Sequence, residues 1–282
     1  MKPILLPTDF SENAANAIRY GLNIAKITKA SVIFFHVNHV PVIAPNTPVG
    51  VYDTLIRTEE EQQLESLYRI RDTMFAELGI NAEEISAQCI VKLGFAVDEI
   101  NAVAKEHNAG LIVMGTQGAS GLQKVFIGTN AASVIKNSEC AVLSIPSTVH
   151  YKKIEKIVLA TDYHLSKDAK SHAPLLEIAL LFNAEVLILN IKRQMEEVPT
   201  FDQALEGLKI ENVFKSVNHS FHFSESDDVI EGIENFVKHS NADVLAMLPH
   251  KKSIFELLFK KSHTEEIAYH ANIALLTLPE SN

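Results

Sequence analysis

The chain of 282 residues is 47% hydrophobic and 21% charged, the composition of a soluble globular protein with room for two ordinary domains. A formal net charge of -10 argues against broad attraction to nucleic acid or anionic membranes, so we expect neither as a partner. The sequence shows no signal peptide, and no apolar run approaches the roughly 20 residues of a membrane span. We therefore expect a cytoplasmic protein.

The first half of the chain alternates short apolar runs with helical patterns. The apolar runs, which we expect to be buried strands, cover residues 4–6, 31–37, 84–91, 111–114 and 141–145. The helical patterns run from the N-cap Ser11 to about Lys29, from Val51 to Leu78 with Gly79 as C-cap, from after Gly94 to about His107, and from Thr129. A proline-rich loop over 38–50 is long enough to be a lid or a partner surface. This alternation predicts a doubly wound α/β domain.

A glycine-rich segment separates the fourth strand from the last helix of this half. Its spacing is Gly115, two residues, Gly118, nine residues, Gly128 and then Thr129. Glycine lets the backbone approach an anion closely, and the first turn of the following helix offers unpaired N–H groups, so the segment is suited to phosphate. It differs from the dinucleotide fingerprint and from the Gly-Lys-Ser/Thr phosphate loop, because Lys124 lies inside the nine-residue gap.

This spacing between a buried strand and a helix closely resembles the nucleotide-binding loop of the universal stress protein family. The resemblance implies an adenine nucleotide alpha hydrolase-like fold, with a five-stranded parallel sheet in the order 3-2-1-4-5. That order would bring Asp9 and Gly115 to neighbouring strand ends, where open parallel sheets bind their ligands. The ligand implied is ATP.

The resemblance also implies roles for individual residues. Asp9 would face the adenosine, Pro7 and Thr8 would shape the wall beside it, and the backbone of Val37 would meet adenine. The phosphates would be cradled by Gly115, Gly118, Gly128, Thr129 and Asn130, with Met114 preceding them as a core residue. From the residues alone, the alternative role of Asp9 is that of a turn or capping aspartate, and the alternative for the glycines is a glycine-rich turn followed by an N-cap. The family often has a basic residue next to the second glycine, whereas Ala119 and Ser120 stand here, which favours ADP or AMP over ATP.

The chain is an internal duplication. Residues 157–162 parallel residues 4–9, residues 186–191 parallel 32–37, and ALLTLP at 274–279 matches AVLSIP at 141–146. A polar connector over 147–153 separates the copies. We therefore predict two tandem doubly wound domains, at residues 1–147 and 151–282.

The second copy has lost the glycine segment. An offset of 133 places Leu248, Lys251 and Lys261 where the first copy has its three glycines. We expect a single nucleotide site, in the first domain, with the second as a built-in dimer partner. The resemblance suggests that the domains meet through edge strands at 140–146 and 272–278. Four lysines at 251, 252, 260 and 261 could hold another anion, although a solvated basic face is the favoured interpretation.

These features favour a nucleotide-binding regulatory protein of the stress response, whose ligand orders the loops that a protein partner reads. No catalytic residue is predicted, because residues 115–129 contain no acidic side chain and the chain has no nucleophile elbow. Two alternatives remain: a slow ATPase in which Asp9 and Thr129 orient Mg²⁺ and water, and a nucleotide-free scaffold. Pairing of two tandem chains into a homodimer also stays open.

The positions of the histidines and cysteines do not predict a metal site. His219 and His222 are three residues apart in a predicted strand and should point to opposite faces, so no metal site is predicted. The two cysteines, Cys89 and Cys140, lie in apolar runs and are expected to be reduced, buried thiols.

Overall fold

The structure is a computed structural model that describes residues 1–39, 49–116, 128–161, 171–192, 201–248 and 273–279. Its strands are β1 Ile4–Pro7, β2 Val32–Asn38, β3 Ala87–Leu93, β4 Leu111–Gly115, β5 Ala141–Ile145, β6 Lys156–Ala160, β7 Glu185–Lys192, β8 His219–Glu225, β9 Val244–Met247 and β10 Ala274–Thr277. Its helices are α1 Glu12–Thr28, α2 Val49–Leu78, α3 Ala96–Glu106, α4 Thr129–Asn137, α5 Ala173–Phe182, α6 Phe201–Phe214 and α7 Val229–Ser240.

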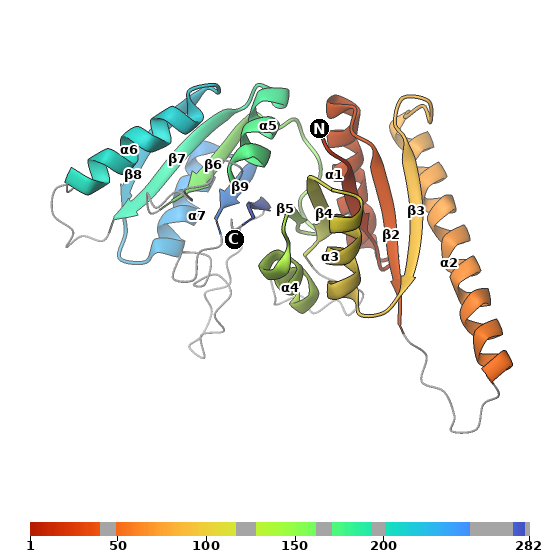
Figure 1. The fold of residues 1–282 in the computed structure, drawn as a ribbon. Coiled ribbons are helices and arrows are strands. Elements are labelled where there is room, and N and C mark those ends of the chain that lie inside the picture. Colours follow the sequence, from red (N-terminus) through yellow and green to blue (C-terminus); the bar gives the residue numbers. More distant parts are fainter. Residues whose placement is uncertain (40–48, 117–127, 162–170, 193–200, 249–272, 280–282) are drawn as a thin grey trace.

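These strands form one sheet in the order β3-β2-β1-β4-β5-β10-β9-β6-β7-β8 (Figure 1). Each half therefore has the predicted order 3-2-1-4-5, and the predicted tandem α/β fold is confirmed. Pairing is parallel within each half and antiparallel between β5 and β10, where Leu143 lies opposite Leu276. This confirms that the halves join through their edge strands. The domain boundaries at 147 and 151 stay a prediction.

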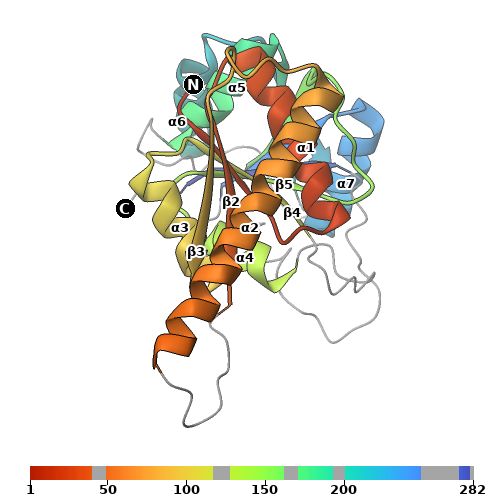
Figure 2. The same cartoon turned by 90° about the vertical axis from the view of Figure 1, so that its right-hand side faces the viewer.

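Helices cover both faces of the sheet, which explains why its central strands are apolar runs. Helices α1, α2, α5 and α6 share one apolar cluster on one face, and it continues across the joint between the halves. On the other face, α3 and α4 cover the first half and α7 the second (Figures 1 and 2). The carboxyl ends of the strands point in opposite directions in the two halves, because β5 and β10 are antiparallel.

Both predicted ends of α1 and the predicted C-terminal end of α2 are confirmed, whereas α2 begins at Val49, two residues before its predicted start. Ser11 Oγ accepts a hydrogen bond from Ala14 N, and Lys29 ends α1 in the left-handed conformation. Gly79, at φ +60, follows the last residue of α2. Much of the first half of α2 is exposed and projects past the sheet (Figure 2).

The predicted strand at 84–91 was wrong at its start, because β3 begins at Ala87. Glu84 N donates to Asn81 O at 2.9 Å, and Glu83 N donates to Asn81 Oδ1 at 3.1 Å. These bonds form a turn whose asparagine competes with the strand for backbone donors. Most of the predicted loop at 38–50 lies outside the described residues.

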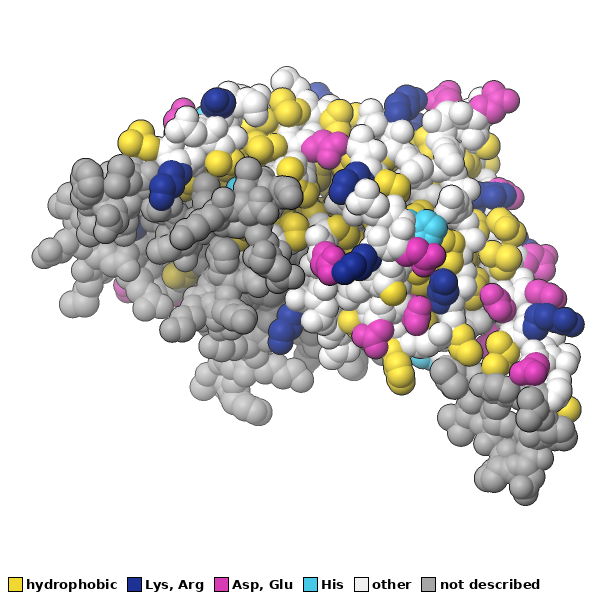
Figure 3. Space-filling view, in the orientation of Figure 1, with side chains coloured by type: hydrophobic (Ala, Val, Ile, Leu, Met, Phe, Trp, Pro, Cys, Tyr) yellow, Lys and Arg dark blue, Asp and Glu magenta, His cyan; other side chains and the backbone are white. Residues whose placement is uncertain are grey.

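Acidic and basic side chains are interspersed over the described part of the face in Figure 3. On the described part of this face, the charged side chains therefore do not gather into one acidic patch. Within the described ranges, no helix combines the length and apolar character needed to cross a membrane.

Candidate functional site

The predicted site residues that the structure describes gather at one edge of the first half of the sheet. β1 lies between β2 and β4 and is parallel to both, so the carboxyl ends of these three strands lie together (Figure 1). This places Asp9, Val37 and Gly115 at the same edge, beside the switch point between β1 and β4. Gly118 lies outside the described residues, as do Ala119, Ser120 and Lys124.

The turn after β1 is fixed by several hydrogen bonds. Oδ1 of the exposed Asp9 accepts from Ser11 N at 3.0 Å and from Ser11 Oγ at 2.5 Å. Phe10 N donates to Thr8 Oγ1 at 3.0 Å. Asp9 therefore has the alternative role of a turn aspartate. The hydrogen bonds from Ser11 also hold its carboxylate at the end of β1.

Sequence reasoning missed two residues of this turn, Phe10 and His36. Phe10 has φ 64, in the left-handed region that non-glycine residues seldom adopt. Its ring lies 4.4 Å from that of His36, and His36 Nδ1 lies 2.7 Å from Thr8 O. A ring contact between consecutive strand ends stabilises the strained turn, and no periodicity in the sequence indicates it.

Gly115 lies directly against the first turn of α1. A Cβ added at this position would be 2.7 Å from Nδ2 of Asn13. This close packing is sufficient to explain why residue 115 is a glycine. Met114 is buried in the cluster under α3 and α4, confirming it as a core residue, and Val37 packs partly buried against the same cluster. Whether Gly115 also contacts a ligand stays a prediction.

A backbone hydrogen bond joins Thr116 and Gly128, the described residues on either side of 117–127. Thr116 N donates to Ile145 O at 3.1 Å, and Gly128 N donates to Thr116 O at 2.5 Å. Thr116 is 1% exposed, and among the described residues its hydroxyl oxygen has no hydrogen-bond partner. A buried hydroxyl in this state is uncommon and marks a position where a bound polar group would be stabilising.

The N-terminus of α4 faces the same edge. Gly128 is its N-cap and supplies no side-chain hydrogen bond, while Thr129 and Asn130 in the first turn are exposed. The N–H groups of this first turn therefore donate no hydrogen bond to an N-cap side chain, because Gly128 has none. They and the helix dipole would favour an anion.

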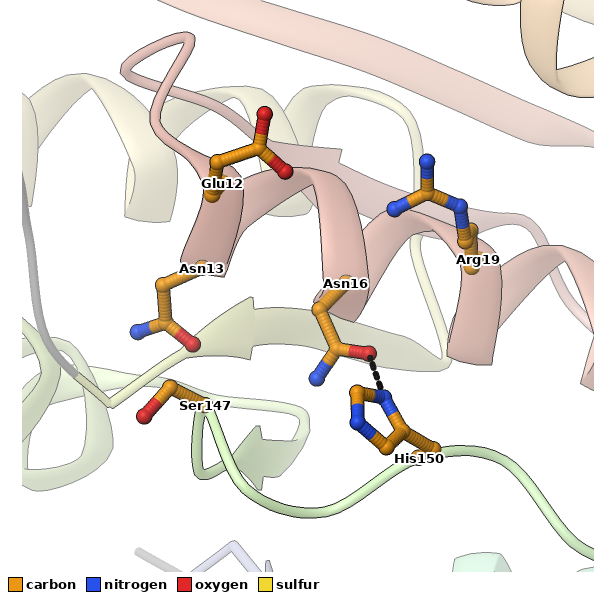
Figure 4. Close-up of a pocket in the computed structure, with 6 residues that line it drawn as sticks. All are labelled: Glu12, Asn13, Asn16, Arg19, Ser147 and His150. Atoms are coloured by element: carbon orange, nitrogen blue, oxygen red, sulfur yellow. Dashed lines mark hydrogen bonds between the residues drawn. The ribbon is translucent and has the colours of Figure 1, made fainter.

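A groove of about 450 Å³ lies between α1 and the connector (Figure 4). It is lined by Glu12, Asn13, Asn16, Arg19, Ser147 and His150. Asn16 Nδ2 donates to Pro146 O at 3.3 Å and to Val149 O at 2.8 Å, and its Oδ1 lies 3.1 Å from His150 Nδ1. None of the ten predicted site residues lines the groove. Its clearest role is to hold the connector against α1.

The corresponding edge of the second half is only partly described. Leu248, at the position of Gly115, is buried after β9. Lys251, Lys252, Lys260, Lys261 and Asp162 lie outside the described residues. The predicted loss of the glycine segment therefore rests on the sequence.

The two histidines of β8 point to opposite faces, as predicted. His219 lies against Phe214 of α6, whereas the ring of His222 lies 5.0 Å from Phe236 of α7. Burial lowers the pKa of His219, but hydrogen bonds with Val217 O and Glu211 outweigh it, so the pKa is raised overall. Among the described side chains, no group of three or more potential metal ligands occurs.

Both cysteines are free thiols, as expected, but each is only partly buried. Burial raises the pKa of Cys89 to about 11 and also raises the pKa of Cys140. Both thiols are therefore poor nucleophiles at neutral pH.

The fold, together with the edge where β1, β2 and β4 end, thus defines the class of the protein. It is a doubly wound α/β protein with a glycine segment at its switch point. Residues 1–146 match the model of the universal stress protein family, so the chain belongs to that family. It is 31% identical over 144 residues to universal stress protein MJ0531 of Methanocaldococcus jannaschii, covering 51% of this chain and 81% of that protein. It is 28% identical over 148 residues to universal stress protein YxiE of Bacillus subtilis, covering 50% of this chain and 97% of that protein.

A solved structure shares the whole tandem fold. The universal stress protein of Archaeoglobus fulgidus aligns with a TM-score of 0.71 and 17% identity, covering 99% of this chain and 98% of that one. At this identity the likeness concerns the fold alone. It supports two consecutive copies of one domain as the architecture of the chain.

Proposed function

We propose that the first half of the chain binds one adenine nucleotide at the carboxyl edge of β1, β2 and β4, and that the protein acts as a nucleotide-dependent regulator. The observation that carries this proposal is the start of α4. An N-terminus without a side-chain cap and the buried Thr116 hydroxyl lie at the two ends of one glycine segment. Both are polar groups that a phosphate would satisfy.

The remaining predicted residues fit the nucleoside end of such a ligand. Asp9 is exposed at the end of β1 and held there by Ser11, in position to accept hydrogen bonds from ribose hydroxyls. Val37 offers an apolar surface on the neighbouring strand. The proposed ligand is ATP, ADP or AMP, with or without Mg²⁺, the proposed partner is a protein that reads the bound state, and the proposed location is the cytoplasm.

The test is to denature freshly purified protein, identify released nucleotide by mass spectrometry, and titrate nucleotide-free protein with ATP, ADP and AMP. We expect about one nucleotide per chain and tight binding that Gly118→Lys abolishes. Gly50→Lys is the matched control, because Gly50 lies on the exposed start of α2 with no atom within 4 Å of an added Cβ.

Two outcomes would change the interpretation. Absence of released nucleotide together with no thermal stabilisation by any of the three would contradict the proposal and favour a scaffold. Multiple-turnover phosphate release that disappears in Gly118→Lys would add slow ATP hydrolysis to binding.

A further inference from the structure

Phe95 is the most exposed of the large hydrophobic side chains that the structure describes, at 75%. It is the N-cap of α3 and makes no side-chain capping bond. Ser, Thr, Asp or Asn at an N-cap would stabilise the helix relative to such a residue. Neither helix capping nor core packing accounts for a phenylalanine here.

The backbone around Phe95 is fixed to the strand that ends at the proposed site. Gly94 N donates to Asn38 O at 3.0 Å, continuing the β2–β3 pairing past Asn38 and Leu93. A Cβ at Gly94 would lie 2.7 Å from Oε1 of Glu99, so the turn is closely packed against α3. Phe95 is thus held next to the carboxyl end of β2 although its ring is exposed.

The helix that Phe95 precedes, α3, packs on the same face of the sheet as Val37. Val97, two residues later, packs against the same apolar cluster as Val37, the residue expected to meet adenine. The turn from β3 into α3 runs along the edge where β1, β2 and β4 end (Figure 1). The turn that carries this exposed ring is therefore bonded to the end of β2, the strand of Val37, where the nucleoside end of the proposed site is expected.

We propose that Phe95 is a specificity-determining residue that stacks on the base of the bound nucleotide. This inference rests on the proposed function and adds a means of recognising the base. An exposed ring held by a fixed backbone loses little conformational freedom on binding, and base–aromatic contacts contribute substantially to nucleotide affinity. Phe95 would select ligands that carry a flat aromatic base as well as phosphates.

The first experiment compares Phe95→Ala with the wild-type full chain by calorimetric titration with ATP and with inorganic triphosphate, which has no base. We expect ATP to bind roughly tenfold more weakly in the variant, and binding of triphosphate to be unchanged. Phe223→Ala is the matched control, because Phe223 is 60% exposed on β8 in the other half. Its affinity for ATP should equal that of the wild type.

The second experiment exploits the absence of tryptophan from the sequence. Phe95→Trp and Phe223→Trp each introduce one tryptophan on the surface. Stacking on a base should quench the fluorescence of the tryptophan at 95 when ATP is added, with no change for the tryptophan at 223. Inorganic triphosphate should quench neither.

Each remaining outcome overturns the inference in a recognisable way. Wild-type binding of ATP with unchanged affinity in Phe95→Ala and no quenching at 95 would reject the role of Phe95 and leave the proposed function standing. Equal weakening of ATP and triphosphate would reject base stacking in favour of a general structural role. Failure of the wild type to bind ATP, ADP or AMP would reject the inference and the proposed function together.

Discussion

Gly115 and Asn13 are packed so closely that a Cβ at residue 115 would lie 2.7 Å from Nδ2 of Asn13 and 3.2 Å from its backbone oxygen. The carboxyl end of β4 is therefore in direct contact with the first turn of α1. Asn13 in turn lines the groove that holds the connector. The strand end that leads into the glycine segment thus contacts the helix that holds the connector between the two halves.

Gly115→Ala should lower the free energy of unfolding by about 1–3 kcal/mol, because the added methyl group forces Asn13 and its backbone to move. Urea denaturation measures this change. Gly50→Ala is the control, since a Cβ there meets no atom within 4 Å and alanine should stabilise the helix by up to about 1 kcal/mol. An unchanged midpoint in Gly115→Ala would show that α1 can yield at this contact.

Asn16→Ala should destabilise the chain by about 1–3 kcal/mol and make the connector more sensitive to proteases. Asn16 is buried, and its removal leaves the Pro146 and Val149 carbonyl oxygens without the amide that now donates to them. Limited proteolysis followed by mass spectrometry should locate new cleavage in 147–153. Asn23→Ala is the control, because Asn23 bonds only to Arg19 O of its own helix among the contacts described for it. Equal protease resistance in both variants would contradict this account of the groove.

The sequence predicted the fold well because its signals are local and repeated. Buried parallel strands must be apolar, so the runs at 4–6, 111–114 and 141–145 gave strands within a residue or two. Ser11 and Gly79 marked helix ends because capping chemistry depends on a few adjacent residues. The start of β3 was misplaced because an asparagine turn interrupts an otherwise strand-like run.

The site was predictable only in outline. Glycine spacing indicated where an anion could bind, but it could not reveal that Gly115 also has to admit Asn13, because that contact joins residues about 100 positions apart. The strained Phe10, its contact with His36 and the exposure of Phe95 depend on how three strand ends meet. Such relationships appear only in three dimensions.

Asp243→Ala should destabilise the chain by about 2–3 kcal/mol, several times more than Lys152→Ala. Oδ2 of the buried Asp243 accepts from Glu155 N at 2.7 Å and Lys156 N at 2.9 Å, and both donors would lose a charged partner. Lys152 Nζ lies 2.7 Å from Oδ1, but its side chain is 63% exposed, so its removal should cost under about 1 kcal/mol. Denaturation of both variants in parallel measures the difference. Comparable losses would mean that the ion pair, and not the backbone bonds, fixes the start of β6.

Alkylation of Cys89 by iodoacetamide should be slow at pH 8 and accelerate about tenfold per pH unit until it levels near pH 11, because only the thiolate reacts and burial raises the pKa to about 11. The measurement uses Cys140→Ser, which leaves a single thiol, with the same variant in denaturant as the control. There the rate should level near the ordinary cysteine pKa of about 8.5.

The same shift predicts how stability depends on pH. Between about pH 9 and 11 the folded chain retains a proton on Cys89 that the unfolded chain has lost, so the free energy of unfolding should fall as pH rises through this window. Cys89→Ser removes the titrating group, and its stability should fall less steeply than that of the wild type over the same range. Two outcomes would show that the Cys89 thiol is solvated and not shielded between β3 and α2. One is that the free energy of unfolding falls equally steeply with pH in the wild type and in Cys89→Ser. The other is that the alkylation rate of the folded chain levels near pH 8.5.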